Sequence, residues 1–305
     1  MVTRQAAGRA VEIEGVRLTH PGRVLYPAQG ITKRDLALYY QTVAPWLMPH
    51  VAGRPLSLVR CPAGEGGACF YQKHFERGLP DGLTGVDIAE KAGRATYAMV
   101  EELRGLVALV QLGVLELHPW GATAARLETP DRMIFDLDPD PEMPWPDVVA
   151  AAVELRDLLA GMGFTSFAKT TGGKGLHVMV PVTPQLDWER FRAAARAIAV
   201  RLAERAPRRY TVELPKAARR HRIFVDYLRN SRGQTAVAPY SPRARAGAPV
   251  ATPLAWDEVM QALRPDRFTV ATLPRRLESL SADPWAGMAK LRQRFSAALL
   301  RTLGV

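Results

Sequence analysis

The alternation of hydrophobic and acidic side chains over residues 133–138, MIFDLD, predicts a β-strand with two different faces. Because successive side chains of a strand point to opposite faces, Phe135 and Leu137 share one face, and Asp136 and Asp138 share the other. Two carboxylates ~5 Å apart at an effective dielectric of ~20 repel each other by roughly 3 kcal/mol. The pattern therefore indicates a strand with one buried face and one acidic face that needs a cation beside it.

The segments around this strand alternate between strand-like and helix-like patterns. Apolar residues at helical spacing predict helices at about 147–161 and 188–206, the second capped by Asp187 and ended by Pro207. Short apolar runs predict three more strands, at 165–170, 176–181 and 222–228. The resulting order β-α-β-β-α-β is that of an RRM/ferredoxin-like sheet. In this sheet the fourth strand lies beside the first, and the third lies on the first strand's other side.

The two ends of the chain are less regular. The N-terminal part begins with a strand-like segment at 10–20 and a helix capped by Thr32, followed by short strands and Gly/Pro-rich loops. The tail has helical patterns near 256–264 and 284–302. We expect a single α/β (α+β) domain over residues 1–305. Its parts would be an N-terminal α/β subdomain (about 1–125), a palm-like catalytic core (about 126–250) and C-terminal flanking helices (about 251–305).

The composition is that of a globular protein with a basic surface. The 305 residues are 48% hydrophobic, and 41 Lys and Arg against 30 Asp and Glu give a net charge of +11. This excess favours a polyanionic partner such as nucleic acid, although a basic protein without such a partner has the same balance. The longest apolar run, 106–117, is too short to span a membrane, and residues 1–15 lack a secretion signal.

The chain has two cysteines, Cys61 and Cys69. So small a number predicts no disulfide framework and fits a cytoplasmic location. A zinc site that adds His74 is disfavoured, because the two cysteines lack the usual C-x₂₋₄-C spacing. We therefore expect no disulfide framework and no zinc site in this region.

A third carboxylate, Asp226, belongs to the predicted fourth strand. The predicted strand order places it beside Asp136 and Asp138 on one open face of the sheet. Three aspartates are hard oxygen ligands that suit Mg²⁺ or Mn²⁺, and two such ions ~4 Å apart can clamp an attacking hydroxyl and a departing pyrophosphate. The alternative is that Asp136 and Asp138 only begin a turn at Pro139. Asp140 is interpreted as a turn residue.

The segment KTTGGKGLHVMVP, residues 169–181, combines a glycine-rich turn with polar side chains. The residues concerned are Thr171, Gly172, Gly173, Lys174, Gly175 and His177. The glycines allow a tight turn whose N–H groups point at an anion, and the side chains add a hydroxyl, a charge and an imidazole. A plain β-hairpin with a glycine-rich turn is an equal alternative, and no Walker or G-x-G-x-x-G motif is present.

A basic, loop-rich segment follows the fourth strand at residues 229–247. It contains Arg229, Arg232, Arg243 and Arg245, which are placed to reach phosphate groups. A solvated basic loop is the alternative interpretation. The position of the segment directly after Asp226 favours a functional role.

Five segments, FYQKH, HPWGA, FDLDPD, TTGGKGLHVMVP and RIFVDYLRNSRGQTAVAPYSPRA, together resemble the polymerase domain of bacterial ATP-dependent DNA ligase D. This domain is a branch of the archaeo-eukaryotic primase superfamily and acts in non-homologous end joining. The resemblance runs from residue 19 to about residue 290. It implies a primase-like core and a metal-dependent, template-directed nucleotidyltransferase. Such an enzyme adds ribo- or deoxynucleotides to DNA 3′ ends in gap filling and end processing.

The resemblance also implies roles for individual residues. The ligands of two Mn²⁺ or Mg²⁺ ions would be Asp136, Asp138 and Asp226, with His118 near them. The residues that would contact DNA are Phe70, stacked on the template strand, and Arg23 with Lys33, at the downstream 5′-phosphate. The residues that would hold the incoming nucleoside triphosphate are Thr171 (usually Ser in this family), Gly172, Gly173, Lys174, His177, Arg229, Arg243 and Arg245.

The partners that the resemblance implies are gapped DNA or double-stranded DNA ends with a 5′-phosphate, Ku, and ligase and phosphoesterase domains of the same protein. It implies a location at the nucleoid during repair and no membrane. No ligase motif of the K-x-D-G kind is present, so we expect an excised domain or a stand-alone homologue. The alternatives are a de novo primase and a non-catalytic DNA-end-binding module. An RRM-like RNA-binding scaffold lacks the aromatic signature of that class.

Overall fold

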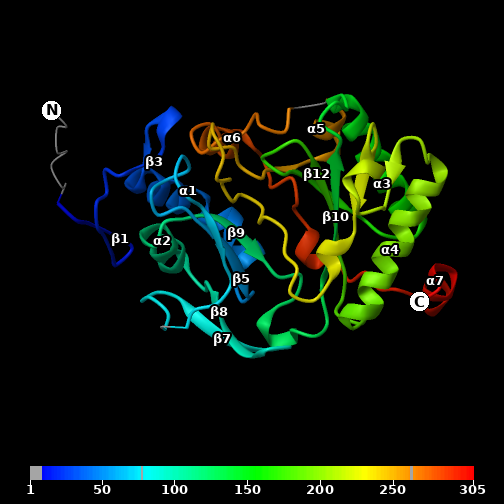
Figure 1. The fold of residues 1–305 in the computed structure, drawn as a ribbon, viewed down its shortest axis with the longest axis horizontal. Coiled ribbons are helices and arrows are strands. Elements are labelled where there is room, and N and C mark those ends of the chain that lie inside the picture. The colour runs from blue at the N-terminus through cyan, green and yellow to red at the C-terminus, as the bar shows by residue number, and fades with distance from the viewer. Residues whose placement is uncertain (1–8, 77, 262–263) are drawn as a thin grey trace.

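The computed structural model describes residues 9–76, 78–261 and 264–305. It contains two larger sheets that lie side by side, each with its own helices (Figure 1). The N-terminal sheet lies in the part of the chain coloured blue through cyan to blue-green, and the second sheet lies in the green to orange part. The mixed α/β class agrees with the class expected from the sequence.

The second sheet has the strand order β13-β14-β10-β12-β11-β15. Its strands are β10 (Arg132–Pro139), β11 (Phe167–Thr170), β12 (Leu176–Pro181), β13 (Tyr210–Thr211), β14 (Ile223–Asp226) and β15 (Pro253–Leu254). The central strand β10 pairs antiparallel with β12 and β14. This confirms the predicted ferredoxin-like order of the four main strands. β14 ends at Asp226, before the predicted boundary, because residues 228–230 turn into a 3₁₀ helix.

Two helices, α3 (Trp145–Gly161) and α4 (Trp188–Arg205), pack on the hydrophobic face of this sheet. Phe135 and Leu137 of β10 are fully buried in one cluster with Leu155 of α3 and Phe191 of α4. Burial of such side chains contributes roughly 1.5–3 kcal/mol each. The acidic face of β10 points the other way, toward a cavity that residues of both sheets line.

The N-terminal sheet consists of β5 (Leu56–Arg60), β6 (Phe70–Gln72), β7 (Thr84–Glu90), β8 (Gly93–Met99) and β9 (Val114–Pro119). The helices of this part are α1 (Lys33–Val51) and α2 (Leu103–Gln111), which pack on each other. Thr32 and Asp35 form a capping box at the start of α1, as the sequence predicts. Four short strands come first: β1 (Val11–Ile13), β2 (Val16–Leu18), β3 (Val24–Tyr26) and β4 (Ile31–Thr32).

A single disulfide joins Cys61 and Cys69, a bridge that was not predicted from the sequence. β5 and β6 pair antiparallel, with Arg60 opposite Phe70. The next pair in that register is Cys61 and Cys69, whose Cα atoms are 4.3 Å apart. Cysteine spacing alone does not reveal this proximity, because it follows from the pairing of β5 with the short strand β6.

We expect the double substitution Cys61→Ser, Cys69→Ser to lower the free energy of unfolding by ~2.5 kcal/mol. This value is the chain entropy that a cross-link over a separation of eight residues removes from the unfolded state. Urea unfolding of the parent protein, with and without a thiol reductant, and of the double variant measures it. Identical urea midpoints for all three samples would contradict a formed, stabilising disulfide.

The C-terminal flank departs most from the predicted pattern. Its helices are α5 (Trp256–Met260), α6 (Leu273–Ser279) and α7 (Ala297–Leu303), so the helix predicted at 284–302 was wrong over residues 284–296. The reason is that the buried Trp285 indole donates to Ala168 O at 2.8 Å and Gly287 has a φ of +83°, which interrupts a helix. The helix predicted at 256–264 ends at Met260, and residues 262–263 lie outside the described residues.

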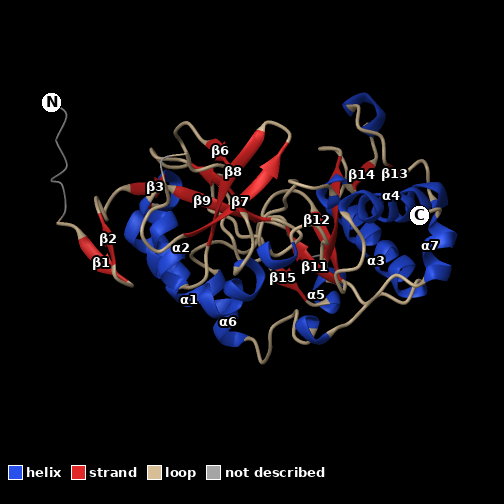
Figure 2. Cartoon of the chain, turned by 90° about the horizontal axis from the view of Figure 1, so that it is seen from below, coloured by secondary structure: helices blue, strands red, loops and turns tan. Residues whose placement is uncertain are grey.

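The tail returns toward the N-terminal part of the molecule. Helix α6 packs against α1, so the flank bridges both halves (Figure 2). Among the described residues, no helix has the length and apolar character needed to cross a membrane.

Candidate active site

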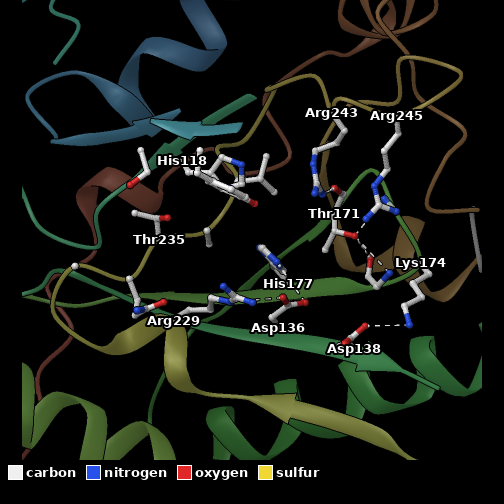
Figure 3. Close-up of a pocket in the computed structure, with 18 of the residues that line it drawn as sticks. His118, Asp136, Asp138, Thr171, Lys174, His177, Arg229, Thr235, Arg243 and Arg245 are labelled. Carbon is white, nitrogen blue, oxygen red and sulfur yellow. Dashed lines mark hydrogen bonds and ion pairs between the residues drawn. The ribbon is translucent and has the colours of Figure 1, made fainter. Parts of the chain in front are cut away.

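A cavity of about 410 Å³ lies between the two sheets (Figure 3). Its lining includes most of the residues that the sequence singled out: His118, Asp136, Asp138, Thr171, Gly173, Lys174, His177, Arg229, Arg243 and Arg245. The acidic face of β10 forms one side, and residues of β5, β6 and β9 contribute to the opposite side. The fold thus gathers carboxylates and basic groups from segments that are far apart in the chain.

Asp136 and Asp226 lie directly opposite each other on β10 and β14. The guanidinium of Arg229 lies beside both, with its Nη2 3.1 Å from Asp226 Oδ2 and its Nε 3.8 Å from Asp136 Oδ2. On the other side, Asp136 Oδ1 is 3.4 Å from His177 Nε2. The cation that the sequence pattern requires beside the carboxylates is therefore supplied by the chain itself.

Asp138 has two basic neighbours of its own. Lys174 Nζ lies 3.3 Å from its Oδ1, and Arg219 Nη1 lies 3.7 Å from its Oδ2. Lys174 Nζ also donates to Pro139 O at 2.8 Å, which ties the glycine-rich turn to the end of β10. Arg219, a residue that the sequence analysis did not single out, therefore belongs to this site.

Asp136 and Asp226 differ in how readily they bind a proton. Burial raises the pKa of Asp136, but His177, Arg229 and Lys169 outweigh burial and bring this pKa down to about 2. Burial raises the pKa of Asp226, Arg229 lowers it in part, and the charge of Asp136 raises it again. Asp136 is therefore fully ionised at neutral pH, and Asp226 is the carboxylate of the pair that accepts a proton first.

The three aspartates suit a hard divalent cation by their chemistry, but their side chains are not gathered as a metal centre. Within residues 9–76, 78–261 and 264–305, no group of three or more His, Cys, Asp or Glu side chains is arranged to hold a metal ion. The contacts explain this, because Arg229, Lys174 and Arg219 already neutralise the carboxylates. Carboxylate oxygens are the donors that Mg²⁺ and Mn²⁺ prefer, so such an ion would compete with these basic groups.

Thr171 holds the glycine-rich turn between β11 and β12. Its Oγ1 accepts hydrogen bonds from the N–H groups of Gly173 and Gly175 at 3.2 and 3.4 Å, and donates to Gly175 O at 3.1 Å. Gly172 has a φ of +64°, a conformation that favours glycine. A Cβ on Gly175 would lie 2.5 Å from Leu137 O, so the close approach of the turn to β10 requires glycine there.

Two arginines reach this turn from the loop after β14. Arg243 Nη1 donates to Thr171 O, and Arg243 Nε lies 3.0 Å from Glu116 Oε2. Figure 3 shows Arg243 and Arg245 both pointing from the loop toward Thr171. The cavity therefore has a basic end beside its acidic side, an arrangement suited to a polyphosphate next to carboxylates.

His118 lines the same cavity, and its hydrogen-bond partner is Glu116 rather than an aspartate. His118 Nε2 lies 2.7 Å from Glu116 Oε2, and the ring of Tyr71 packs edge-on at 5.8 Å. The sequence analysis missed Glu116 and Tyr71. Glu116 could have been found from the sequence. It is an acidic residue within the apolar strand VLELHP, and this is the same alternation that reveals Asp136.

Lys169 is a further residue that the sequence analysis missed. It lies on β11 opposite His177 and is almost fully buried, and its Nζ finds no acceptor among the described residues. Burial and the charge of Arg243 lower the pKa of Lys169 to about 7, although Asp136 raises it in part. Burial and Lys169 in turn lower the pKa of His177 to about 4, so that this imidazole is neutral at pH 7.

Phe70 and Tyr71 are adjacent aromatic residues on β6 with different surroundings. Phe70 is 47% exposed and lies outside the cavity lining, with the guanidinium of Arg60 5.5 Å from its ring centre. Tyr71 is 65% exposed and lines the cavity. Both are open to a stacking partner, and of the two only Tyr71 lines the cavity that Asp136 and Asp138 also line.

Arg23 and Lys33 lie together at the start of α1, away from the main cavity. The N–H of Lys33 donates to Arg23 O at 2.8 Å. Arg23 has an exposed side chain that donates to Pro62 O at 3.0 Å. Lys33 is buried, and its Nζ donates to Thr19 O at 3.1 Å and to Gln111 Oε1 at 3.2 Å. Burial and the charge of Arg23 lower the pKa of Lys33.

Comparison with protein families and solved structures supports the same relationship. A family model described as the LigD primase-polymerase domain matches residues 32–285. A solved structure, the polymerase domain from Mycobacterium tuberculosis Ligase D in complex with DNA, superposes with a TM-score of 0.84. The two chains are 30% identical, and the match covers 91% of this chain and 99% of that one.

Curated relatives carry the same family name. The multifunctional non-homologous end joining protein LigD of Pseudomonas aeruginosa is 41% identical over 95% of this chain and 35% of its own length. The protein of that name from Mycolicibacterium smegmatis is 34% identical over 81% of this chain and 32% of its own length. The chain thus spans about a third of these relatives. The resemblance seen in the motifs is confirmed, and the chain belongs to the LigD primase-polymerase domain family.

Proposed function

We propose that the chain is a metal-dependent, template-directed nucleotidyltransferase that adds nucleotides to DNA 3′ ends during non-homologous end joining. One observation carries this proposal: Asp136 and Asp138 line one side of a single cavity, and a glycine-rich turn with two arginines lies at one end. Asp226 does not line this cavity but lies directly opposite Asp136 on the neighbouring strand. A nucleoside triphosphate presents a chain of negative phosphates next to the phosphorus that is attacked. The basic end of the cavity matches the negative phosphates, and the carboxylates match the phosphorus that is attacked.

The residues have distinct proposed roles. The carboxylates of Asp136, Asp138 and Asp226 would hold divalent cations, Mn²⁺ or Mg²⁺. Such ions, when bound, activate the attacking 3′-hydroxyl and neutralise charge on the departing pyrophosphate. The turn residues Thr171, Gly172, Gly173 and Lys174, together with His177, Arg229, Arg243 and Arg245, would bind the triphosphate and the sugar. His118 would contact the nucleotide from the opposite side of the cavity.

The proposed substrate is DNA with a gap or a broken double-stranded end. A structural neighbour was solved in complex with DNA, and the net charge of +11 suits a polyanion. The exposed rings of Phe70 and Tyr71 would stack on template bases, a contact that tolerates any sequence. Ku and ligase or phosphoesterase domains are the further partners that we propose, because the relatives are named as multifunctional end-joining proteins.

A primer-extension assay tests the function directly. Gapped DNA is incubated with the protein, Mn²⁺ or Mg²⁺, and each ribo- or deoxynucleotide in turn. The proposal predicts addition of the nucleotide that pairs with the template, and only when a primer 3′-hydroxyl is present. Synthesis without a primer would favour a de novo primase. DNA binding without any addition would favour a non-catalytic end-binding module.

We expect gapped DNA with a 5′-phosphate to bind more tightly than the same DNA with a 5′-hydroxyl. The start of α1 carries the partial positive charge of a helix N-terminus beside Arg23 and Lys33, and these charges together attract a terminal phosphate. Arg23→Gln should remove much of the preference and reduce the slope of log K against log salt by roughly 0.9. Fluorescence anisotropy titrations measure both quantities.

Arg17→Gln, a change of an exposed arginine on β2, is the matched control and should keep the preference. Equal affinity of the parent protein for both DNA ends would contradict the phosphate site. Lys33 is a poorer test position than Arg23, because its substitution also leaves two partly buried carbonyl groups without their donor.

A further inference from the structure

Glu116 is a buried carboxylate for which the proposed reaction has no role. It lies on β9 and is only 4% exposed. Its polar contacts are His118 Nε2 at 2.7 Å, the N–H of Ala244 at 2.8 Å and Arg243 Nε at 3.0 Å. We assign His118 and Arg243 to nucleotide binding, and Ala244 lies between Arg243 and Arg245, which we also assign to it.

Arg243 is held at both ends of its guanidinium. Nε pairs with Glu116 on the N-terminal sheet, and Nη1 donates to Thr171 O on the glycine-rich turn of the other sheet. The side chain is largely buried, so this pairing fixes the direction in which it points. The N–H of Ala244 also binds Glu116, which fixes the backbone between Arg243 and Arg245.

Glu116 also determines which ring nitrogen of His118 carries the proton. Burial opposes ionisation of Glu116, but His118, Arg243 and the N–H of Ala244 lower its pKa to about 2. Burial lowers the pKa of His118 although Glu116 raises it in part, so this imidazole is neutral at pH 7. An ionised carboxylate can only accept a hydrogen bond, so the proton of the neutral ring lies on Nε2 and Nδ1 is left as an acceptor.

We propose that Glu116 is a positioning residue for the incoming nucleotide. It holds Arg243 in the direction of the triphosphate and His118 in the Nε2–H tautomer, and it joins the two halves of the molecule across the cavity. This inference rests on the proposed function, because it takes Arg243 and His118 as nucleotide contacts. A purely structural role, in which Glu116 only neutralises a buried arginine, is the competing explanation.

Glu116→Gln tests the proposal, because the amide keeps the size of the side chain and removes its charge. The amide also turns an N–H donor toward Arg243 Nε or His118 Nε2, which both face the carboxylate in the parent protein. Glu258→Gln is the matched control, since Glu258 on α5 likewise accepts from Arg276 Nη2 at 2.7 Å and from the N–H of Ala255 at 2.9 Å. Glu258 does not line the cavity.

Three quantities are measured on the parent and both variants: the Kd of a fluorescent ATP analogue with Mn²⁺, the Kd of gapped DNA, and the melting temperature. Glu116→Gln should weaken nucleotide binding by about tenfold or more, while Glu258→Gln changes it less than twofold. DNA affinity should change less than twofold in both. Equal nucleotide affinity of the two variants, or parallel losses of nucleotide and DNA binding in Glu116→Gln, would overturn the positioning role.

A double variant covers the case in which Glu116→Gln folds poorly. Arg243→Gln, Glu116→Gln leaves no unpaired charge at this position, and its nucleotide affinity should lie within threefold of that of Arg243→Gln alone. A further tenfold loss would overturn action through Arg243. If the parent binds nucleotide but extends no primer, the proposed function fails, and the comparison of Kd values still decides the role of Glu116.

Discussion

Asp136→Asn is expected to abolish nucleotide addition while leaving the fold intact. Asp136 has a lowered pKa and lines the cavity, and it lies beside His177 and Arg229. The amide has the same shape but no charge to offer a divalent cation. A loss of ~4 kcal/mol of transition-state stabilisation corresponds to a roughly thousandfold slower reaction. Asp138→Asn should have an effect of the same order.

Asp140→Asn is the matched control for these variants. Asp140 follows Pro139 as the turn residue that the sequence predicts, and its Oδ1 accepts from the N–H of Glu142 at 3.0 Å. It is not part of the cavity lining, so its variant should extend primers at nearly the parent rate. Single-turnover extension and a circular dichroism melt are measured for all three variants. More than a tenth of the parent activity in Asp136→Asn would contradict the assignment of the carboxylates.

The second sheet, which contains β10, could be predicted from the sequence because its signals are local and consistent. Alternation defines β10, and periodicity defines α3 and α4 to within about two residues. The order of the strands then follows from the ferredoxin-like topology, which places Asp226 opposite Asp136. The C-terminal flank could not be predicted in this way, because Trp285 is fixed by a hydrogen bond to a distant strand.

The site could be predicted only in part. The sequence identifies the carboxylates, the glycine-rich turn and the basic loop, and the cavity brings members of each together. It does not reveal that Arg229 lies between Asp136 and Asp226, because side-chain direction depends on the turn after β14. The disulfide and the contact between Glu116 and Arg243 were missed for a related reason, since both depend on strand or loop pairing across the fold.

Lys169→Met is expected to make the protein more stable, with the largest gain below pH 7. The Lys169 ammonium is buried without an acceptor among the described residues, and burial and Arg243 lower its pKa from 10.5 to about 7. Below pH 7 the folded and unfolded chains both carry the proton, so folding bears the full cost of burying the charge. Between pH 7 and about 10 the unfolded chain binds the proton and the folded chain releases it. The parent protein's free energy of unfolding therefore rises with pH in this window relative to the variant's.

Methionine fills a similar volume without a charge. Lys169→Met should therefore raise the free energy of unfolding by about 1–4 kcal/mol at pH 6, and this increase should shrink toward pH 10. Urea unfolding at pH 6, 8 and 10 measures it. Lys33→Met is the matched control, because Lys33 also has little exposed surface but its ammonium donates to Thr19 O and Gln111 Oε1. Removing a satisfied ammonium leaves partly buried acceptors unpaired and should destabilise by about 1–3 kcal/mol. Loss of stability in Lys169→Met at pH 6, or a gain that does not change with pH, would show that the Lys169 charge is compensated in the folded protein.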